Sequence, residues 1–220
     1  MTTPCEAYYL EMGVLPISVL LRARRITYLH CILNRDKKSM LYSFFTTQWH
    51  NPCKGDWTEQ IKEDLAELKI PCSFNDIQIK SKESFKRYVK IKAKELALKN
   101  LLSKKEGHSK MEKLTYRDLN IQPYFLSEDI GINQKRTVFK YRVRMERFGE
   151  NFRGGQSQVI CPLCKLHLDN QEMGFQCPEI KKEIEINGST DEIYRGEIKM
   201  ETIRTMTKIL EIRKARIEND

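Results

Sequence analysis

Apolar residues recur every three or four positions along most of the chain, which is the spacing of amphipathic helices. After Pro16, residues 17–34 carry apolar side chains on more than one helical face, which predicts a long and largely buried helix. Three arginines interrupt its apolar pattern: Arg22, Arg24 and Arg25. One edge of this helix must therefore meet solvent or an anionic partner.

Two shorter helices are expected next along the chain. The first covers residues 39–49, and the second covers residues 57–68. Asp56 is a suitable N-cap for the second helix, and Glu59 completes the pattern of a capping box. Pro71 cannot continue a helix, so the pattern predicts that the element ends before it.

The most basic helix of the chain is predicted over residues 81–103. Its apolar residues follow helical spacing, and lysine and arginine fill much of the remaining surface. Residues 104–113 contain Gly107 and polar neighbours, which is typical of an exposed linker. We select four cations of this helix as candidate nucleic-acid contacts: Lys86, Arg87, Lys90 and Lys94.

Residues 132–149 fit two patterns. Alternating apolar and charged residues suggest a strand, whereas the spacing of Val138, Tyr141, Met145 and Phe148 suggests a helix. We predict a helix because the segment is long and rich in good helix formers. Farther along, a short helix is expected over residues 178–185, and a final helix over residues 198–217.

These elements predict a mostly α fold, with helical domains followed by a small zinc-finger-like segment and a C-terminal helix. We expect four regions. A helical region covers residues 1–106, a linker covers 107–131, a basic helix with the finger covers 132–186, and the C-terminal helix lies within 187–220.

The amino-acid composition excludes several classes of protein. The 220 residues are 40% hydrophobic and 31% charged, which is enough to bury a core. No apolar run is long enough to span a membrane, and the first residues do not resemble a signal peptide. Four of the seven cysteines are scattered along the chain, which argues against a disulfide framework. We therefore expect an intracellular protein of the nucleus or cytoplasm, with no membrane partner.

The formal net charge is +9, and two segments hold the whole excess. Residues 80–113 carry twelve Lys and Arg against four Asp and Glu, and residues 131–155 carry seven against two. Clustered cations are typical of a surface that binds a polyanion. For residues 80–113 taken alone, we favour a solvated helix face that only keeps the protein soluble, because lysine-rich amphipathic helices are common.

The chemistry of the chain is concentrated in one cluster of cysteine and histidine. Cys161, Cys164, His167 and Cys177 lie within seventeen residues, and together they form the ligand set of a Cys₃His zinc site. The two cysteines of a Cys-x-x-Cys pair lie close enough to share one tetrahedral ion. Buried free cysteines remain the alternative explanation. No neighbouring motif would activate a zinc-bound water, so a zinc ion here is expected to be structural.

Several runs resemble the C-terminal region of non-LTR (LINE-like) retrotransposon polyproteins, downstream of the reverse transcriptase. They are EMGVLP at residues 11–16, FKYRVRM at 139–145, FGENFR at 148–153, CPLC at 161–164 and CP at 177–178. In that family an arginine-bearing helix leads into a Cys-Cys-His-Cys finger, whose histidine usually lies nearer the last cysteine than His167 does.

The resemblance implies a truncated, non-catalytic piece of such a polyprotein that contacts the phosphates of RNA or DNA. The chain contains no polymerase signature, no evident nuclease centre and no phosphate-binding loop, so we expect no enzymatic activity and no small-molecule substrate. Arginine binds phosphate oxygens in a bidentate manner. We therefore add four arginines to the candidate contacts: Arg142, Arg144, Arg147 and Arg153.

Two other hypotheses fit the same sequence. One is a hydrolase whose catalytic residues come together only in the folded chain, and the other is an interaction module. The helices can form a protein-interaction or structural module that binds no nucleic acid. A truncated chain would also leave apolar faces of its first helix unpaired, so we expect self-association through exposed apolar surface.

Overall fold

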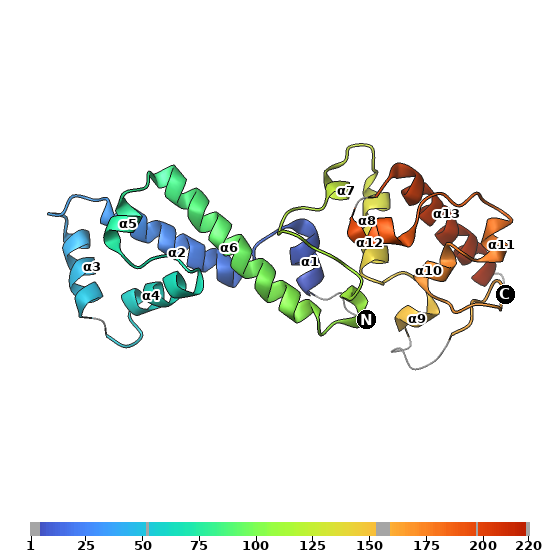
Figure 1. The fold of residues 1–220 in the computed structure, drawn as a ribbon, viewed down its shortest axis with the longest axis horizontal. Helices are drawn as coiled ribbons and strands as arrows, with labels where there is room; N and C mark the ends of the chain where they lie inside the picture. The colour runs from blue at the N-terminus through green and yellow to red at the C-terminus, as the bar shows by residue number, and fades with distance from the viewer. Residues whose placement is uncertain (1–4, 52, 153–158, 197, 219–220) are drawn as a thin grey trace. The chain divides into compact units, whose positions relative to one another are not determined.

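A computed structural model describes residues 5–51, 53–152, 159–196 and 198–218. These residues form helices joined by turns, and the described backbone pairs in only two isolated β-bridges (Figure 1). The mostly α fold expected from the sequence is confirmed. Contacts divide the chain into two compact units, which we call the basic unit (residues 14–102) and the cysteine unit (residues 1–13 with 103–220).

The helices of the basic unit are α2 (Ile17–Leu33), α3 (Met40–His50), α4 (Trp57–Glu67), α5 (Phe74–Gln78) and α6 (Lys82–Lys105), whose last residues belong to the cysteine unit. The cysteine unit contains α1 (Cys5–Met12), the 3₁₀ turn η1 (Ser109–Met111), α7 (Pro123–Leu126), α8 (Ile132–Arg142), α9 (Gly149–Phe152), α10 (Gln171–Gly174), α11 (Pro178–Lys181), α12 (Thr190–Arg195) and α13 (Met200–Ile217).

Helix α2 is the centre of the basic unit, because α3, α4 and α5 all pack against it. Its buried side chains include Ile26, Leu29 and Leu33, and α4 contributes Ile61 and Leu65 to the same unit. The apolar pattern of residues 17–34 predicted such a buried helix.

The arginines of α2 find their anionic partner inside the basic unit. Arg25 donates two hydrogen bonds to the carboxylate of Asp64 on α4, at 2.6 and 3.0 Å, and Asp64 is fully buried. Arg22 pairs with Glu67 at the end of the same helix. These two guanidinium groups therefore join α2 to α4, and Arg24 stays exposed.

Helix α4 begins and ends with defined caps. The side chain of Asp56 accepts a hydrogen bond from the backbone N–H of Glu59, as predicted for the N-cap. The Glu59 carboxylate accepts from the N–H of Gly55, one residue before the N–H that a capping box uses. At the other end, Lys69 adopts a left-handed conformation with φ of 53°, and the N–H of Ile70 donates to the carbonyl of Leu65. This Schellman motif ends the helix before Pro71 is reached, at a position where glycine is the usual residue.

In the cysteine unit, α8 packs against α12 and α13. The core between its elements holds Tyr141, Phe148, Phe175, Met206 and two of the cysteines, Cys161 and Cys177. Two buried polar side chains in this core, Tyr141 and Gln171, are paired with each other's main chain. The hydroxyl of Tyr141 donates to the carbonyl of Gln171 at 2.7 Å, and the Gln171 amide donates back to the Tyr141 carbonyl at 2.8 Å.

Two features of the structure differ from the regions expected from sequence. Residues 1–13 belong to the cysteine unit and not to the helical region that follows them, because Glu11 on α1 is paired inside that unit. Residues 107–131, expected to be a linker, contribute Met111, Leu114, Leu119 and Tyr124 as buried side chains.

The helix predicted over residues 132–149 is correct only as far as Arg142. Val143 caps it, and Arg144 adopts a left-handed conformation with φ of 52°. The N–H of Arg144 donates to the Tyr141 carbonyl, and the N–H of Met145 donates to the Lys140 carbonyl at 2.7 Å. This second Schellman motif closes the helix, so Arg144 and Arg147 do not share a helical face.

Candidate metal centre

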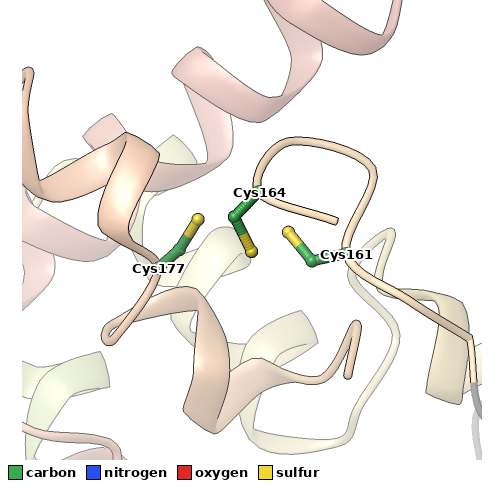
Figure 2. Close-up of side chains that lie close together, drawn as sticks. All are labelled: Cys161, Cys164 and Cys177. Atoms are coloured by element: carbon green, nitrogen blue, oxygen red, sulfur yellow. The ribbon is translucent and has the colours of Figure 1, made fainter. Parts of the chain in front are cut away.

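Three cysteines that are separated in sequence meet in the cysteine unit. The sulfur atoms of Cys161, Cys164 and Cys177 all lie within 4.8 Å of one another. Figure 2 shows them gathered between the turn at residues 161–164 and the start of α11. Two zinc–sulfur bonds of about 2.3 Å at a tetrahedral angle place their sulfurs about 3.8 Å apart, so this group can hold a metal ion.

A tight turn brings the first two cysteines together. The N–H of Cys161 donates to the carbonyl of His167 at 2.7 Å, and the N–H of Lys165 donates to the carbonyl of Cys161 at 2.9 Å. Lys165 has a φ of 53°, and a β-bridge between Ile160 and Leu168 closes the loop. The turn therefore folds back on itself and points the Cys164 sulfur toward Cys161.

Backbone N–H groups donate hydrogen bonds to two of the three sulfurs, those of Cys164 and Cys177. Burial raises the pKa of the Cys164 thiol, but hydrogen bonds from the N–H groups of Leu166 and His167 and from the neighbouring thiols outweigh it, and the net pKa is lowered. Burial also raises the pKa of Cys177, and the N–H groups at the start of α11 only partly oppose this. Both sulfurs thus accept hydrogen bonds that favour a thiolate, which is the form that binds metal ions.

His167 contributes its main chain and not its imidazole. Its side chain is exposed, and within the described residues the three cysteines form a group that no histidine, aspartate or glutamate joins. The expectation that the His167 imidazole is the fourth ligand is therefore not met in this structure. The tight turn holds the His167 main chain through its carbonyl and N–H, while the side chain is exposed to solvent.

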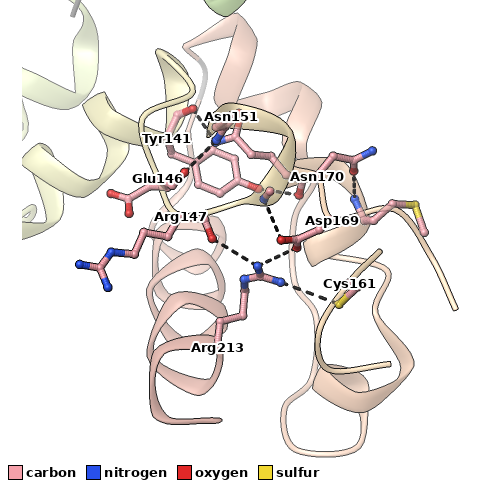
Figure 3. A network of polar contacts seen from close by, with 11 residues as sticks. Tyr141, Glu146, Arg147, Asn151, Cys161, Asp169, Asn170 and Arg213 are labelled. Carbon is pink, nitrogen blue, oxygen red and sulfur yellow. Dashed lines mark hydrogen bonds and ion pairs between the residues drawn. The ribbon is translucent and has the colours of Figure 1, made fainter. Parts of the chain in front are cut away.

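A buried arginine on α13, Arg213, contacts Cys161, and nothing in the sequence pattern indicated this contact. Arg213 donates to the carboxylate of Asp169 at 2.7 Å, to the carbonyl of Arg147 at 3.2 Å and to the sulfur of Cys161 at 3.9 Å (Figure 3). Its guanidinium also lies 4.3 Å from the centre of the Phe148 ring. Arg213 thus places a positive charge beside a group that becomes strongly negative when its thiols ionise.

The arginines predicted to contact phosphate differ in their exposure to solvent. Arg142 is fully buried, and its Nε donates to both carboxylate oxygens of Glu11, at 2.9 and 3.0 Å. Arg144 is only 8% exposed. The structure therefore removes both residues from the accessible surface, because one is committed to a buried ion pair and the other turns inward where α8 ends.

The other two arginines predicted to contact phosphate are Arg147 and Arg153. The side chain of Arg147 is 86% exposed and lies 3.9 Å from Glu218. Arg153 falls outside the residues that the structure describes. Of the three predicted arginine contacts that the structure describes, Arg147 is the one exposed to solvent.

The predicted cations of α6 are mostly accessible. Lys86, Arg87 and Lys90 are exposed, and Lys94 is half-buried. Four cations of α6 form no ion pair within 4.0 Å in the described chain: Lys82, Lys86, Arg87 and Lys90. The lysines at 82, 86, 90 and 94 recur every four residues, so they form one ridge along the helix. We call these four residues the lysine ridge.

Charge is divided very unequally between the two units. The basic unit carries seventeen Lys and Arg against nine Asp and Glu, a net charge of +8. The cysteine unit carries twenty-two against twenty-one, a net charge of +1. Nearly all the positive excess therefore lies in the unit that does not contain the cysteine cluster.

Comparison with protein-family models, curated proteins and solved structures finds no match to this chain. Among the helices of the described residues, none combines the length and the apolar character that crossing a membrane requires.

Proposed function

We propose that this chain is a non-catalytic nucleic-acid-binding protein that contacts RNA or DNA phosphates through α6 and contains a structural zinc ion. We also infer an origin in the C-terminal region of a LINE-like polyprotein, on the strength of the sequence runs that resemble it. The observation that carries the proposal is the net charge of +8 on the basic unit, together with the lysine ridge on its most basic helix.

Electrostatics favours a polyanion as the partner of the lysine ridge. Neighbouring members are one helical step of four residues apart, about 6 Å along the axis. Like charges at this spacing destabilise an isolated helix, and only two acids, Glu83 and Glu95, lie within α6. A row of phosphates relieves this repulsion, and the release of counterions from the nucleic acid supplies the binding free energy.

The three cysteines support a zinc ion with a structural role. Thiolates are preferred zinc ligands, and the ion would fasten the turn at residues 161–168 to the start of α11. Cys161 and Cys177 belong to the core of the cysteine unit, so holding them together stabilises that core. The positive charge of Arg213 offsets part of the negative charge of three thiolates.

A salt titration tests the proposed binding. Affinity for a short single-stranded RNA and for duplex DNA is measured between low and moderate salt, with the wild-type chain and with the double variant Lys86→Gln/Lys90→Gln. Two lost contacts should make the slope of log K against log salt shallower by about 1.4 for a single strand. Lys37→Gln/Lys38→Gln is the matched control, because it removes two exposed charges from a loop of the same unit.

Three results are decisive for this proposal. No binding to either nucleic acid refutes it, and so does binding that is independent of salt. If both double variants lower the affinity and the slope equally, the lysine ridge has no special role and the charge of the unit acts only as a whole.

Metal analysis tests the zinc ion. The purified chain should hold about one zinc ion. Cys161→Ser and Cys177→Ser should lose it, whereas His167→Ala should retain it, because the imidazole lies outside the cysteine group. Loss of zinc in the His167→Ala variant alone would show that this side chain turns toward the sulfurs. Absence of zinc from the wild-type chain would favour buried free cysteines.

One observation favours the alternative of a protein-interaction module. Met40 and Phe44 on α3 are 88% and 60% exposed, and Ile79 is 82% exposed. Large exposed apolar side chains mark interaction surfaces when they are contiguous. If the chain binds no nucleic acid and self-associates in a manner that Phe44→Ser abolishes, this alternative replaces the proposal.

A further inference from the structure

An open cavity of about 820 Å³ lies in the cysteine unit. Its apolar walls come from three stretches of chain and include Phe148, Val159, Ile160, Leu210 and Ile217. Pro162 also lines it, so the turn that positions Cys161 and Cys164 forms part of one wall. Its volume falls within the range of small-molecule pockets, about 300 to 1,000 Å³.

The charged groups of the cavity include four cations and three acids. The cations are Lys140, Arg147, Arg213 and Lys214, and the acids are Glu146, Asp169 and Glu218. Glu218 lies 3.9 Å from Arg147. Burial raises the pKa of Glu146, and the nearby charges of Lys140 and Arg147 oppose this. Figure 3 shows the side chains of Glu146 and Arg147 extending away from Arg213.

Arg213 also lines the cavity, and one of its donors is not used. Its side chain is 4% exposed and forms an ion pair with Asp169, which lines the cavity as well. Both terminal nitrogens of Arg213 have partners, but its Nε is buried and has none among the described residues. A buried donor without a partner costs free energy, and the contacts of the guanidinium with Asp169 and the Phe148 ring offset this cost.

We propose that this cavity receives one unpaired base of a single-stranded nucleic acid, and this inference rests on the proposed function. A heterocyclic base fits the combination of apolar walls and lining cations, since it offers flat faces for packing and is flanked by phosphates. Arg147 and Lys214 then contact the phosphates on either side of the base. The bases of a duplex are stacked and paired, so the cavity selects single strands.

Two oligonucleotides of equal length test the inference. One is a short single strand with 2-aminopurine at its centre, and the other has an abasic site at that position. The base should raise the affinity about 5- to 100-fold over the abasic strand, and its fluorescence should change on binding. Ile160→Ser should remove most of this difference, because Ile160 lines the cavity and is 58% exposed, so the fold should tolerate the change.

The matched control is Leu166→Ser, an exposed leucine of the neighbouring turn that does not line the cavity. Ile217→Ser provides a second variant on a different wall. Circular dichroism of each variant establishes that it is folded.

Each outcome decides between the inference and the proposed function. If the two strands bind equally but with strong salt dependence, the base cavity is wrong and phosphate binding stands. If the base matters but Ile160→Ser and Ile217→Ser leave its contribution unchanged, the base binds elsewhere and the inference fails. If neither strand binds, both the proposed function and the inference fail.

Discussion

The buried ion pair between Glu11 and Arg142 offers the sharpest test of the structure. Both side chains are fully buried, and they come from segments 131 residues apart in the chain. The hydroxyls of Tyr116 and Tyr124 also donate to the Glu11 carboxylate, and Arg142 donates to the carbonyl of Ile193. Glu11→Gln keeps the shape and an acceptor for the hydroxyls but removes the negative charge.

The expected cost follows from this burial. An arginine left in the core without its counter-charge typically destabilises a protein by about 3 to 5 kcal/mol. This is a large part of the roughly 5 to 15 kcal/mol that stabilises an ordinary domain. Removing both charges with Glu11→Gln/Arg142→Met should cost at least about 1 kcal/mol less than the sum of the two single changes, since neither charge is then buried alone.

Urea unfolding measures these effects in each unit. Trp49 and Trp57 both lie in the basic unit, so tryptophan fluorescence reports that unit. Far-UV circular dichroism reports the helices of both units, and the Glu11→Gln variant should show an earlier loss of helical signal. A loss of less than about 1 kcal/mol, or strictly additive single changes, would refute a buried and coupled pair. Arg142 would then be free to contact phosphate, as the sequence suggested.

Three further predictions concern individual sites. Lys69→Gly should stabilise the basic unit by about 0.5 to 1 kcal/mol in urea unfolding, whereas Lys69→Ala should not, because glycine adopts positive φ without strain. Hydrogen bonds from Thr58 and from the N–H groups of Glu59 and Cys53 lower the pKa of Asp56 to about 2. Its contribution is therefore present above about pH 4 and lost as the pH falls toward 2, so acid titration should affect Asp56→Ala less than wild type. Removing metal with a chelator should lower the thermal midpoint of wild type but not of Cys164→Ser.

The sequence by itself determined the local structure. Spacing of apolar residues predicted α2, α3, α4, α6 and α13 to within a few residues, because each helix must bury one stripe of its own side chains. The capping residue Asp56 followed from local hydrogen bonding alone. The Cys-x-x-Cys spacing also predicted that Cys161 and Cys164 lie together, since a short turn leaves few alternatives.

Long-range pairing was decided only by the tertiary structure. An arginine in an amphipathic pattern is expected to be a solvent-exposed cation. Nothing near Arg142 in the sequence shows that Glu11 lies against it. The same applies to Arg213, whose partners Asp169 and Cys161 lie more than forty residues away. The imidazole of His167 is a suitable type of zinc ligand, but in the turn at residues 161–168 His167 forms its contacts through its main chain. Charge and ligand type are properties of a residue, whereas burial and partnership depend on which distant segments fold against it.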